Sequence, residues 1–375
     1  FENLKKKNDL IFIEFIQLLY RHFIKAYFTD IDRKNLLSIS KISEFKIKFN
    51  SLLEKYGDKN ILVMNFMKND SIASIQINKF ILNNKIISLE FFNPGISTYN
   101  LSISNMNNSL IQKINYFYLR KNETVQKVKG KIFNLLVKFY KLKPNYLLVS
   151  GSRLKKSVKK TCKVNQIKII EGSSWDFSKI LSSKTKRILK KKNFALYLDA
   201  PGPKFLSDSH IYKEKLHETV NHTYPSLNKF FSYIEKNLNL KIIVAPHPKT
   251  KIKNKSPLFN YRTVISGKTL ELIRESKFVL TRNSTAVTFA AFYNKPIILF
   301  YTNETRNTEA YQTSLYLSKS LGIKLININE YSQLDLLKLL KFQKKKYKSY
   351  LHNFCNSQKT GVPNYKLIQK IIDNI

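Results

Sequence analysis

The stretch Lys277–Tyr301, KFVLTRNSTAVTFAAFYNKPIILFY, is the clearest indication of the fold class. It begins with one apolar run, Phe278–Thr281, and ends with another, Pro296–Tyr301, and both are typical of buried strands. The residues between them, Ser284–Tyr293, have the composition of a short helix. Two buried strands joined through a helix form the repeating unit of a parallel α/β sheet. The sequence therefore predicts such a sheet, with polar turns at the strand ends.

The turn after the first of these strands is the leading candidate for a ligand site. It comprises Thr281–Thr285, in which Ser284 and Thr285 carry hydroxyls and Arg282 and Asn283 carry nitrogen donors. A helix N-terminus presents free backbone N–H groups and a positive dipole end, which together favour a phosphate. Ser and Thr are also common helix N-caps, so a capping role stays open beside phosphate binding.

A second strand end carries a histidine between two prolines. The apolar run Lys241–Ala245 leads into Pro246, His247 and Pro248, and the prolines stiffen the turn. A fixed imidazole there could hydrogen-bond a phosphate or protonate a departing one, although a loop histidine satisfied by its neighbours would have the same sequence. Ligands of open α/β sheets bind beyond the carboxyl ends of the strands. The sequence therefore predicts a nucleotide site at this edge.

Three further segments supply candidates for the same edge. Asp199 follows the strand FALYL in a Pro-Gly turn and could act as a general base, or it could cap its own loop. Glu304 follows the strand PIILFY and could accept hydrogen bonds from ribose hydroxyls, or remain solvated. Gly267, Lys268 and Thr269 open a helix, where we expect contacts with a base or ribose and an N-cap at Thr269.

The second half of the chain alternates strands with helices, which predicts a doubly wound parallel sheet. The expected strands are Phe194–Leu198, Lys241–Ala245, Arg262–Ile265, Phe278–Thr281, Pro296–Tyr301 and Ile323–Asn327. The expected helices are Tyr212–Leu238, Leu270–Glu275, Ser284–Tyr293, Glu309–Leu321, Tyr331–Phe354 and Tyr365–Ile372.

The first half is predicted to hold helices and a smaller sheet. The expected helices are Leu10–Phe28, Ile39–Tyr56 and Asn108–Leu142, and the expected strands are Ile61–Phe66, Tyr146–Val149 and Gln166–Ile170. Ile75–Leu82 and Lys85–Phe91 are expected to pair as a hairpin. Ser150, Gly151 and Ser152 follow a strand and are expected to line a cleft.

The length of 375 residues allows two domains. The basic, weakly apolar stretch Lys184–Lys192, KTKRILKKK, marks the boundary, so we expect one Rossmann-like domain over 1–185 and another over 186–375. The last helices are expected to pack back on the first domain. Further candidates for the cleft between the domains are Glu171, Gly172, Trp175 and Asp176, although a tryptophan is more often part of a core.

The charge is strongly positive, with 66 basic against 25 acidic residues and a net charge of +41. Such a surplus usually indicates an anionic partner. The basic residues are 57 Lys and only 9 Arg, and Asn, Ile, Phe and Tyr are also abundant, as an AT-rich genome would produce. Proteins that recognise bases favour Arg for bidentate contacts. We therefore expect a general preference for anionic partners and no specific nucleic acid, and contact with an anionic membrane stays open.

The cysteines and histidines predict neither disulfides nor a metal site. Cys162 and Cys355 are far apart and have no metal-ligand spacing, and the six histidines form no His-x-x-x-His pair. The apolar run Leu10–Tyr20 is too short to span a bilayer and lacks a small-residue cleavage site. We expect a cytoplasmic protein without cofactors, and peripheral contact with the inner face of the cytoplasmic membrane is left open.

The order of these motifs resembles the C-terminal half of GT-B glycosyltransferases. The resemblance spans roughly Phe194–Asn327 and rests on Asp199, His247-Pro248, Gly267-Lys268-Thr269 and Ser284-Thr285. The chain is similar to bacterial enzymes of capsule and lipopolysaccharide assembly that use CMP-activated acidic sugars. These enzymes are sialyltransferases, polysialyltransferases and Kdo transferases. In the bacterial sialyltransferases an acidic-Gly motif supplies the base, an HP motif contacts the CMP phosphate, and a Ser-Ser/Thr motif holds that phosphate.

The resemblance implies a role for each matching residue. Asp199 would be the base, His247 and Pro248 would contact the phosphate, and Ser284 and Thr285 would hold it. The usual acidic pair before the glycine is absent, because the chain reads Asp-Ala-Pro-Gly from position 199.

The implied activity is an inverting, metal-independent glycosyltransferase. It would transfer an acidic sugar from a CMP-sugar donor to an anionic surface glycan or glycolipid, with 1–185 as the acceptor domain and 186–375 as the donor domain. A CDP-glycerol glycerophosphotransferase or a UDP-sugar transferase of the same fold is the first alternative. A basic nucleic-acid-binding protein and a catalytically silent scaffold are alternatives of other classes.

Overall fold

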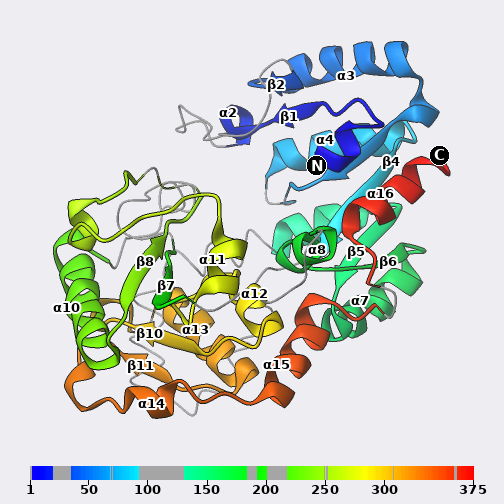
Figure 1. Ribbon diagram of the computed structural model, residues 1–375. Helices are drawn as coiled ribbons and strands as arrows, with labels where there is room; N and C mark the ends of the chain where they lie inside the picture. Colours follow the sequence, from blue (N-terminus) through cyan, green and yellow to red (C-terminus); the bar gives the residue numbers. More distant parts are fainter. Residues whose placement is uncertain are drawn as a thin grey trace, which may run out of the picture.

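The computed structural model describes residues 2–19, 35–67, 69, 71–92, 131–183, 192–200, 218–248, 250, 252–306, 308–358 and 361–375. These residues form two α/β units, each built on a parallel sheet (Figure 1). The N-terminal unit has a four-stranded sheet, β3-β4-β5-β6, and a separate parallel pair, β1-β2. The C-terminal unit has a five-stranded sheet in the order β11-β10-β9-β7-β8. The predicted α/β class with two parallel sheets is confirmed.

The N-terminal unit contains the first six strands. These are β1 (Phe12–Glu14), β2 (Leu36–Ser38), β3 (Leu62–Asn65), β4 (Ile87–Phe92), β5 (Tyr146–Ser150) and β6 (Lys168–Gly172). Its helices are α1 (Glu2–Lys5), α2 (Ile16–Leu19), α3 (Ile42–Tyr56), α4 (Ile72–Asn83), α7 (Ser152–Val164) and α8 (Trp175–Ser182). Residues 131–139 are also helical.

The C-terminal unit contains the remaining strands. These are β7 (Phe194–Leu198), β8 (Lys241–Ala245), β9 (Val279–Thr281), β10 (Ile297–Tyr301) and β11 (Leu325–Asn327). Its helices are α10 (Val220–Leu238), α11 (Thr269–Glu275), α12 (Val287–Phe292), α13 (Glu309–Leu321), α14 (Leu336–Leu339) and α15 (Lys344–Tyr350), followed by the π-helix η7 (Leu351–Cys355) and by α16 (Asn364–Ile372). In the described part of the chain, no helix combines the length and the apolar character needed to cross a bilayer.

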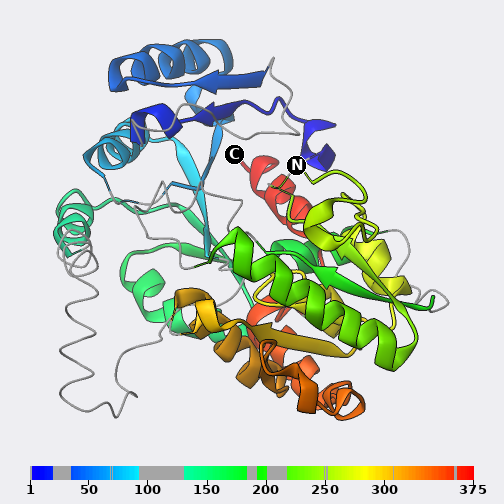
Figure 2. The same ribbon diagram turned by 90° about the vertical axis from the view of Figure 1, so that its left-hand side faces the viewer.

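The C-terminal sheet reverses its winding direction at β7. The chain adds β8 on one side of β7 and then places β9, β10 and β11 on the other side. Because parallel crossovers are right-handed, the reversal puts α10 on one face of the sheet and α11, α12 and α13 on the opposite face (Figures 1 and 2). Doubly wound sheets bind ligands at such a switch point, beyond the carboxyl ends of the strands. A ligand site is therefore expected beyond the carboxyl ends of β7 and β9.

Two predictions for the N-terminal unit are wrong. Ile75–Leu82 is not a hairpin strand but part of α4, which begins with a capping box between Ser71 and Ser74. Of the predicted helix Leu10–Phe28, Phe12–Glu14 form β1, which pairs with β2 in parallel, Ile16–Leu19 form α2, and 20–28 lie outside the described residues. Both errors come from short apolar runs, which fit a strand and a buried helix equally well until capping or pairing decides.

The predicted elements of the C-terminal half differ from the structure in three places. Helix α12 begins at Val287 rather than Ser284, because the Ser284 hydroxyl accepts a hydrogen bond from the Ala286 N–H instead. Arg262–Ile265 forms only an isolated parallel bridge through Val264. The predicted helix Tyr331–Phe354 is broken into shorter pieces. Residues 93–130, 184–191 and 201–217, which include parts of predicted helices and of the boundary stretch, lie outside the described residues.

The C-terminal segment ties the two units together. Helix α15 packs on α12 and α13, η7 packs on α7 and α12, and α16 lies against α1 and β6 (Figure 2). Where η7 crosses the end of β5, the buried Ser150 hydroxyl donates to the Phe354 carbonyl at 3.1 Å. The Ser152 hydroxyl donates to Asn353 Oδ1 at 3.0 Å. Ser150 and Gly151, expected to line an acceptor cleft, are thus packed against η7, whereas Ser152 is half-buried and lines a pocket beside Lys155 and Glu171. The acceptor role of these residues stays a prediction.

Replacing Gly151 by alanine should destabilise the protein more than replacing Gly267. Both glycines have positive φ, 72° and 77°, so an alanine is strained by about 1–3 kcal/mol at either position. A Cβ on Gly151 would lie 2.7 Å from Phe354 Cα, whereas one on Gly267 would meet no atom within 4 Å. We expect about 1–3 kcal/mol of additional loss for Gly151→Ala in urea unfolding. Equal losses would show that η7 does not press on this loop.

Candidate functional site

Three adjacent strands of the C-terminal sheet bring Asp199, His247 and Arg282 to one edge. Asp199 follows β7, His247 stands two residues beyond the end of β8, and Arg282 follows β9. The Asp199 N–H donates to the Ala245 carbonyl at 2.9 Å, and the His247 N–H donates to the Asp199 carboxylate. Residues that the sequence places at separate strand ends therefore meet at the switch point.

Asp199 is enclosed by hydrogen-bond donors. Its side chain is only 5% exposed, and its carboxylate accepts from the Tyr197 hydroxyl at 3.1 Å and from the Ala200 N–H. Burial raises the pKa of Asp199 to about 6, although Arg282 and these donors act in the opposite direction. Such an environment suits a carboxylate that fixes the His247 turn better than one that reaches an acceptor hydroxyl. The general-base role stays a prediction, and the burial disfavours it.

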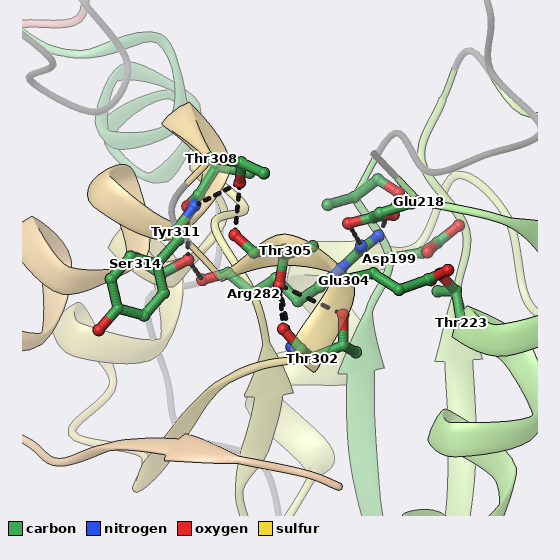
Figure 3. Close-up of polar contacts among 12 residues, drawn as sticks. Asp199, Glu218, Thr223, Arg282, Thr302, Glu304, Thr305, Thr308, Tyr311 and Ser314 are labelled. Carbon is green, nitrogen blue, oxygen red and sulfur yellow. Dashed lines mark hydrogen bonds and ion pairs between the residues drawn. The ribbon is translucent and has the colours of Figure 1, made fainter. Parts of the chain in front are cut away.

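Arg282 is a buried cation beneath the same edge. It is 6% exposed, pairs with Glu218 and donates to the Ala200 carbonyl at 3.3 Å (Figure 3). Within the described chain, Arg282 Nε and Glu218 Oε2 have no hydrogen-bond partner. Burial lowers the pKa of Arg282, but Glu218, Tyr197 and Asp199 outweigh it and raise the pKa above its ordinary value. The Arg282 guanidinium is therefore held in the interior by Glu218 and the Ala200 carbonyl. This disfavours its predicted role as a direct phosphate donor.

The His247 turn is held by its own backbone. The His247 carbonyl accepts from the N–H and the hydroxyl of Thr250 at 2.8 and 2.7 Å. The His247 side chain is partly buried, and Pro248 is exposed. The turn is thus tied to Asp199 on one side and to Thr250 on the other. The phosphate role predicted for His247 and Pro248 stays a prediction.

The Ser-Thr turn, Thr281–Thr285, reaches the N-terminal unit. The Ser284 N–H donates to the Thr281 hydroxyl at 3.3 Å, and Asn283 and Ser284 are partly buried. Helix α12, which follows, has only six residues, so the turn itself offers more to a phosphate than the helix dipole does. Thr285 is exposed, and its hydroxyl is hydrogen-bonded to the Asp176 carboxylate of α8. The turn therefore stands where the two units meet.

Asp176 is the carboxylate that the N-terminal unit places at this junction. It lies in the first turn of α8, after the N-cap Ser174, whose hydroxyl accepts from the Phe177 N–H at 3.3 Å. Burial raises the pKa of Asp176, while the bond with Thr285 and the charge of Lys179 lower it. The sequence marks Asp176 as a cleft candidate without a role. Its position shortly after a predicted strand was the available signal.

The carboxylate of Glu304 is hydrogen-bonded to residues at the start of α10. Its carboxylate accepts from the N–H and hydroxyl of Thr219 at 3.3 and 2.8 Å and from the Thr223 hydroxyl at 3.1 Å (Figure 3). It is therefore a helix-capping group rather than a solvated one. Binding to ribose stays a prediction, and it would require these hydrogen bonds to be exchanged.

Gly267, Lys268 and Thr269 lie on the rim of the same edge. The parallel bridge between Val264 and Val244 directs this segment alongside the end of β8. Gly267 and Lys268 are exposed, and Thr269 is partly buried. The N-cap of α11 is Lys268, so the N-cap predicted at Thr269 is wrong by one residue. Their contact with a base or ribose stays a prediction.

Comparison with known proteins finds similarity among solved structures only. No protein-family model and no curated protein matches the sequence. The structure of UDP-GlcNAc 2-epimerase from Methanocaldococcus jannaschii shares 14% identity over 99% of this chain and 94% of its own, with a TM-score of 0.48. The glycotransferase of kitacinnamycin shares 10% over 88% and 83%, with a TM-score of 0.41. The wall teichoic acid polymerase TagF shares 12% over 89% and 99%, with a TM-score of 0.40.

The two parallel α/β units stand with the Ser-Thr turn of one against α8 of the other. The likenesses specify neither a donor nor a reaction for this chain. In the described residues, no group of three or more His, Cys, Asp or Glu side chains is placed to hold a metal ion. Metal independence stays a prediction.

Proposed function

We propose that this chain is a GT-B-type glycosyltransferase that transfers an acidic sugar from a CMP-activated donor to a surface glycan or glycolipid, with inversion. One observation carries the proposal: the hydroxyl of Thr285 on the donor side meets the carboxylate of Asp176 on the opposite side. Displacement with inversion needs the leaving group on one face of the sugar and the attacking hydroxyl with its base on the other. The two units supply these groups from opposite sides of their junction, so a bound sugar would have to separate Thr285 from Asp176.

The donor side would hold the departing phosphate of CMP. Ser284 and Thr285 supply hydroxyls, the Ser-Thr turn supplies backbone N–H groups, and His247 supplies an imidazole that can donate a proton. A positioned donor of this kind is worth about 3 kcal/mol to a transition state in which charge develops on oxygen. The net charge of +41 would also attract the anionic donor.

The base in this proposal is Asp176 rather than Asp199. Asp199 stands on the same edge as the phosphate-binding groups and is buried, so it cannot meet an acceptor that approaches from the opposite face. Asp176 belongs to the opposite unit, is partly buried and has a raised pKa, as a general base requires. When the phosphate takes the Thr285 hydroxyl, Asp176 loses that donor and becomes available to the acceptor. Asp199 then keeps the His247 turn in place.

A thermal-shift comparison of CMP, CDP, UDP and GDP tests the donor. We expect CMP to stabilise the protein most, by about 2.7 kcal/mol at a concentration of 100 Kd. Thr285→Ala should reduce this stabilisation, whereas Thr161→Ala, at an exposed position of α7, should leave it unchanged. Selective stabilisation by UDP would favour a UDP-sugar transferase, and selective stabilisation by CDP would favour a glycerophosphotransferase. No shift with any of the four nucleotides would overturn the site.

A further inference from the structure

An aromatic cluster stands at the carboxyl edge of the N-terminal sheet. Phe66 follows β3, Phe91 belongs to β4, and Trp175 is the first residue of α8. The rings of Phe66 and Phe91 are stacked, with centroids 4.7 Å apart and planes 5° from parallel. The rings of Phe91 and Trp175 have centroids 5.0 Å apart and are tilted by 40°. We refer to these three side chains as the aromatic platform.

Two of the three rings of the platform are exposed and the third, Phe91, is partly buried, unlike the other phenylalanine cluster of the same unit. Phe66 is 58% exposed and Trp175 is 42% exposed, whereas Phe45 and Phe49 between α3 and α4 are buried. Adjacent large aromatic rings on a surface leave apolar area in water, and contiguous patches of this kind mark binding sites. The platform therefore offers a surface for a ligand with an apolar face.

The position of the platform relates it to the junction between the units. Trp175 immediately precedes Asp176, which is hydrogen-bonded to Thr285 of the Ser-Thr turn. Strands β3 and β4 are neighbours in the sheet, so Phe66 and Phe91 stand at the same carboxyl edge as the start of α8. A molecule lying on the platform would lie near the first turn of α8, which carries Asp176.

We infer that the aromatic platform binds a pyranose ring of the acceptor glycan. A pyranose carries C–H groups on its faces and hydroxyls around its rim, and the face of an aromatic ring is electronegative, so the two stack while the rim stays hydrogen-bonded. The adjacent carboxylate could accept from a rim hydroxyl, which is also the group to be deprotonated. The identification of this sugar as the acceptor rests on the proposed function.

Trp175 makes the test direct, because it is the only tryptophan in the chain. Its emission therefore reports on the surroundings of the platform, without any need for turnover. The probes are soluble oligosaccharides with neutral, N-acetylated and acidic pyranoses, and sorbitol is the open-chain control. We expect a saturable change in emission with at least one pyranose and none with sorbitol.

A pair of variants separates stacking from general effects. Phe66→Ala removes one ring of the platform and should weaken the saccharide affinity by roughly fivefold to tenfold. Ile47→Ala removes a comparably exposed apolar side chain from α3 and should leave the affinity unchanged. Thermal unfolding of both variants checks that they are folded, and CMP should shift both melting temperatures as it does for the parent protein.

The outcomes distinguish the platform from the donor site. No saturable change with any saccharide, or an equal change with sorbitol, would overturn the inference even if CMP stabilises the protein. A change in emission with CMP that is lost in Phe66→Ala would place a nucleobase on the platform and would also overturn it. Saccharide binding that depends on Phe66, in a protein that no nucleotide stabilises, would support the sugar platform while the proposed transferase function fails.

Discussion

Asp176→Asn is expected to lower kcat by about 10²- to 10⁴-fold and to leave CMP binding nearly unchanged. Asparagine has the same shape as aspartate, and its amide oxygen can still accept the hydrogen bond of Thr285. It lacks only the basic carboxylate that would take the proton of the acceptor hydroxyl. Sugar-transfer turnover measures the first effect, and the CMP thermal shift measures the second.

The pH profile gives this prediction a second readout. Burial raises the pKa of Asp176 above the ordinary 3.8, and a base works only when it is deprotonated. Activity should therefore fall as the pH drops through that raised pKa, and this acid limb should be absent from the residual activity of Asp176→Asn. Asp199→Asn is the matched comparison and should mainly weaken CMP binding through the His247 turn. Retained turnover in Asp176→Asn, with turnover lost in Asp199→Asn, would return the base to Asp199.

Arg282→Met is expected to destabilise the protein by about 3–5 kcal/mol. The change removes the cation from a buried ion pair and leaves the Glu218 carboxylate without its partner. Urea unfolding measures the loss. Lys268→Met removes an exposed cation from the rim of the same edge and should change the stability by no more than about 0.5 kcal/mol.

A second substitution identifies the cause of that loss. Adding Glu218→Gln to Arg282→Met removes the uncompensated charge and should recover part of the stability, because a neutral amide costs less to bury than a carboxylate. If Arg282→Met lost no more stability than Lys268→Met, the guanidinium would not support the edge. It would then be better assigned to direct ligand binding.

Most strands of the C-terminal sheet could be predicted from the sequence. Strands buried on both faces read as continuous apolar runs, as in FALYL, KIIVA and PIILFY, and each run was followed by polar residues that the structure places at the carboxyl edge. The N-terminal unit was harder to predict, because its strands are only partly buried. The segment IQINKFIL fits a strand as well as a helix, and the capping box at Ser71 decided for the helix.

The sequence does not show which strand ends are neighbours or which side chains are buried there, because both depend on long-range packing. The order β11-β10-β9-β7-β8 puts Asp199 between the His247 turn and Arg282, and it buries Arg282 against Glu218, 64 positions away in sequence. The crossing of η7 closes the loop at Gly151, and α8 brings Asp176 to Thr285. A local sequence pattern shows the interval at which core-facing residues recur along the chain. It does not record which distant segment covers those residues, because long-range packing fixes that choice.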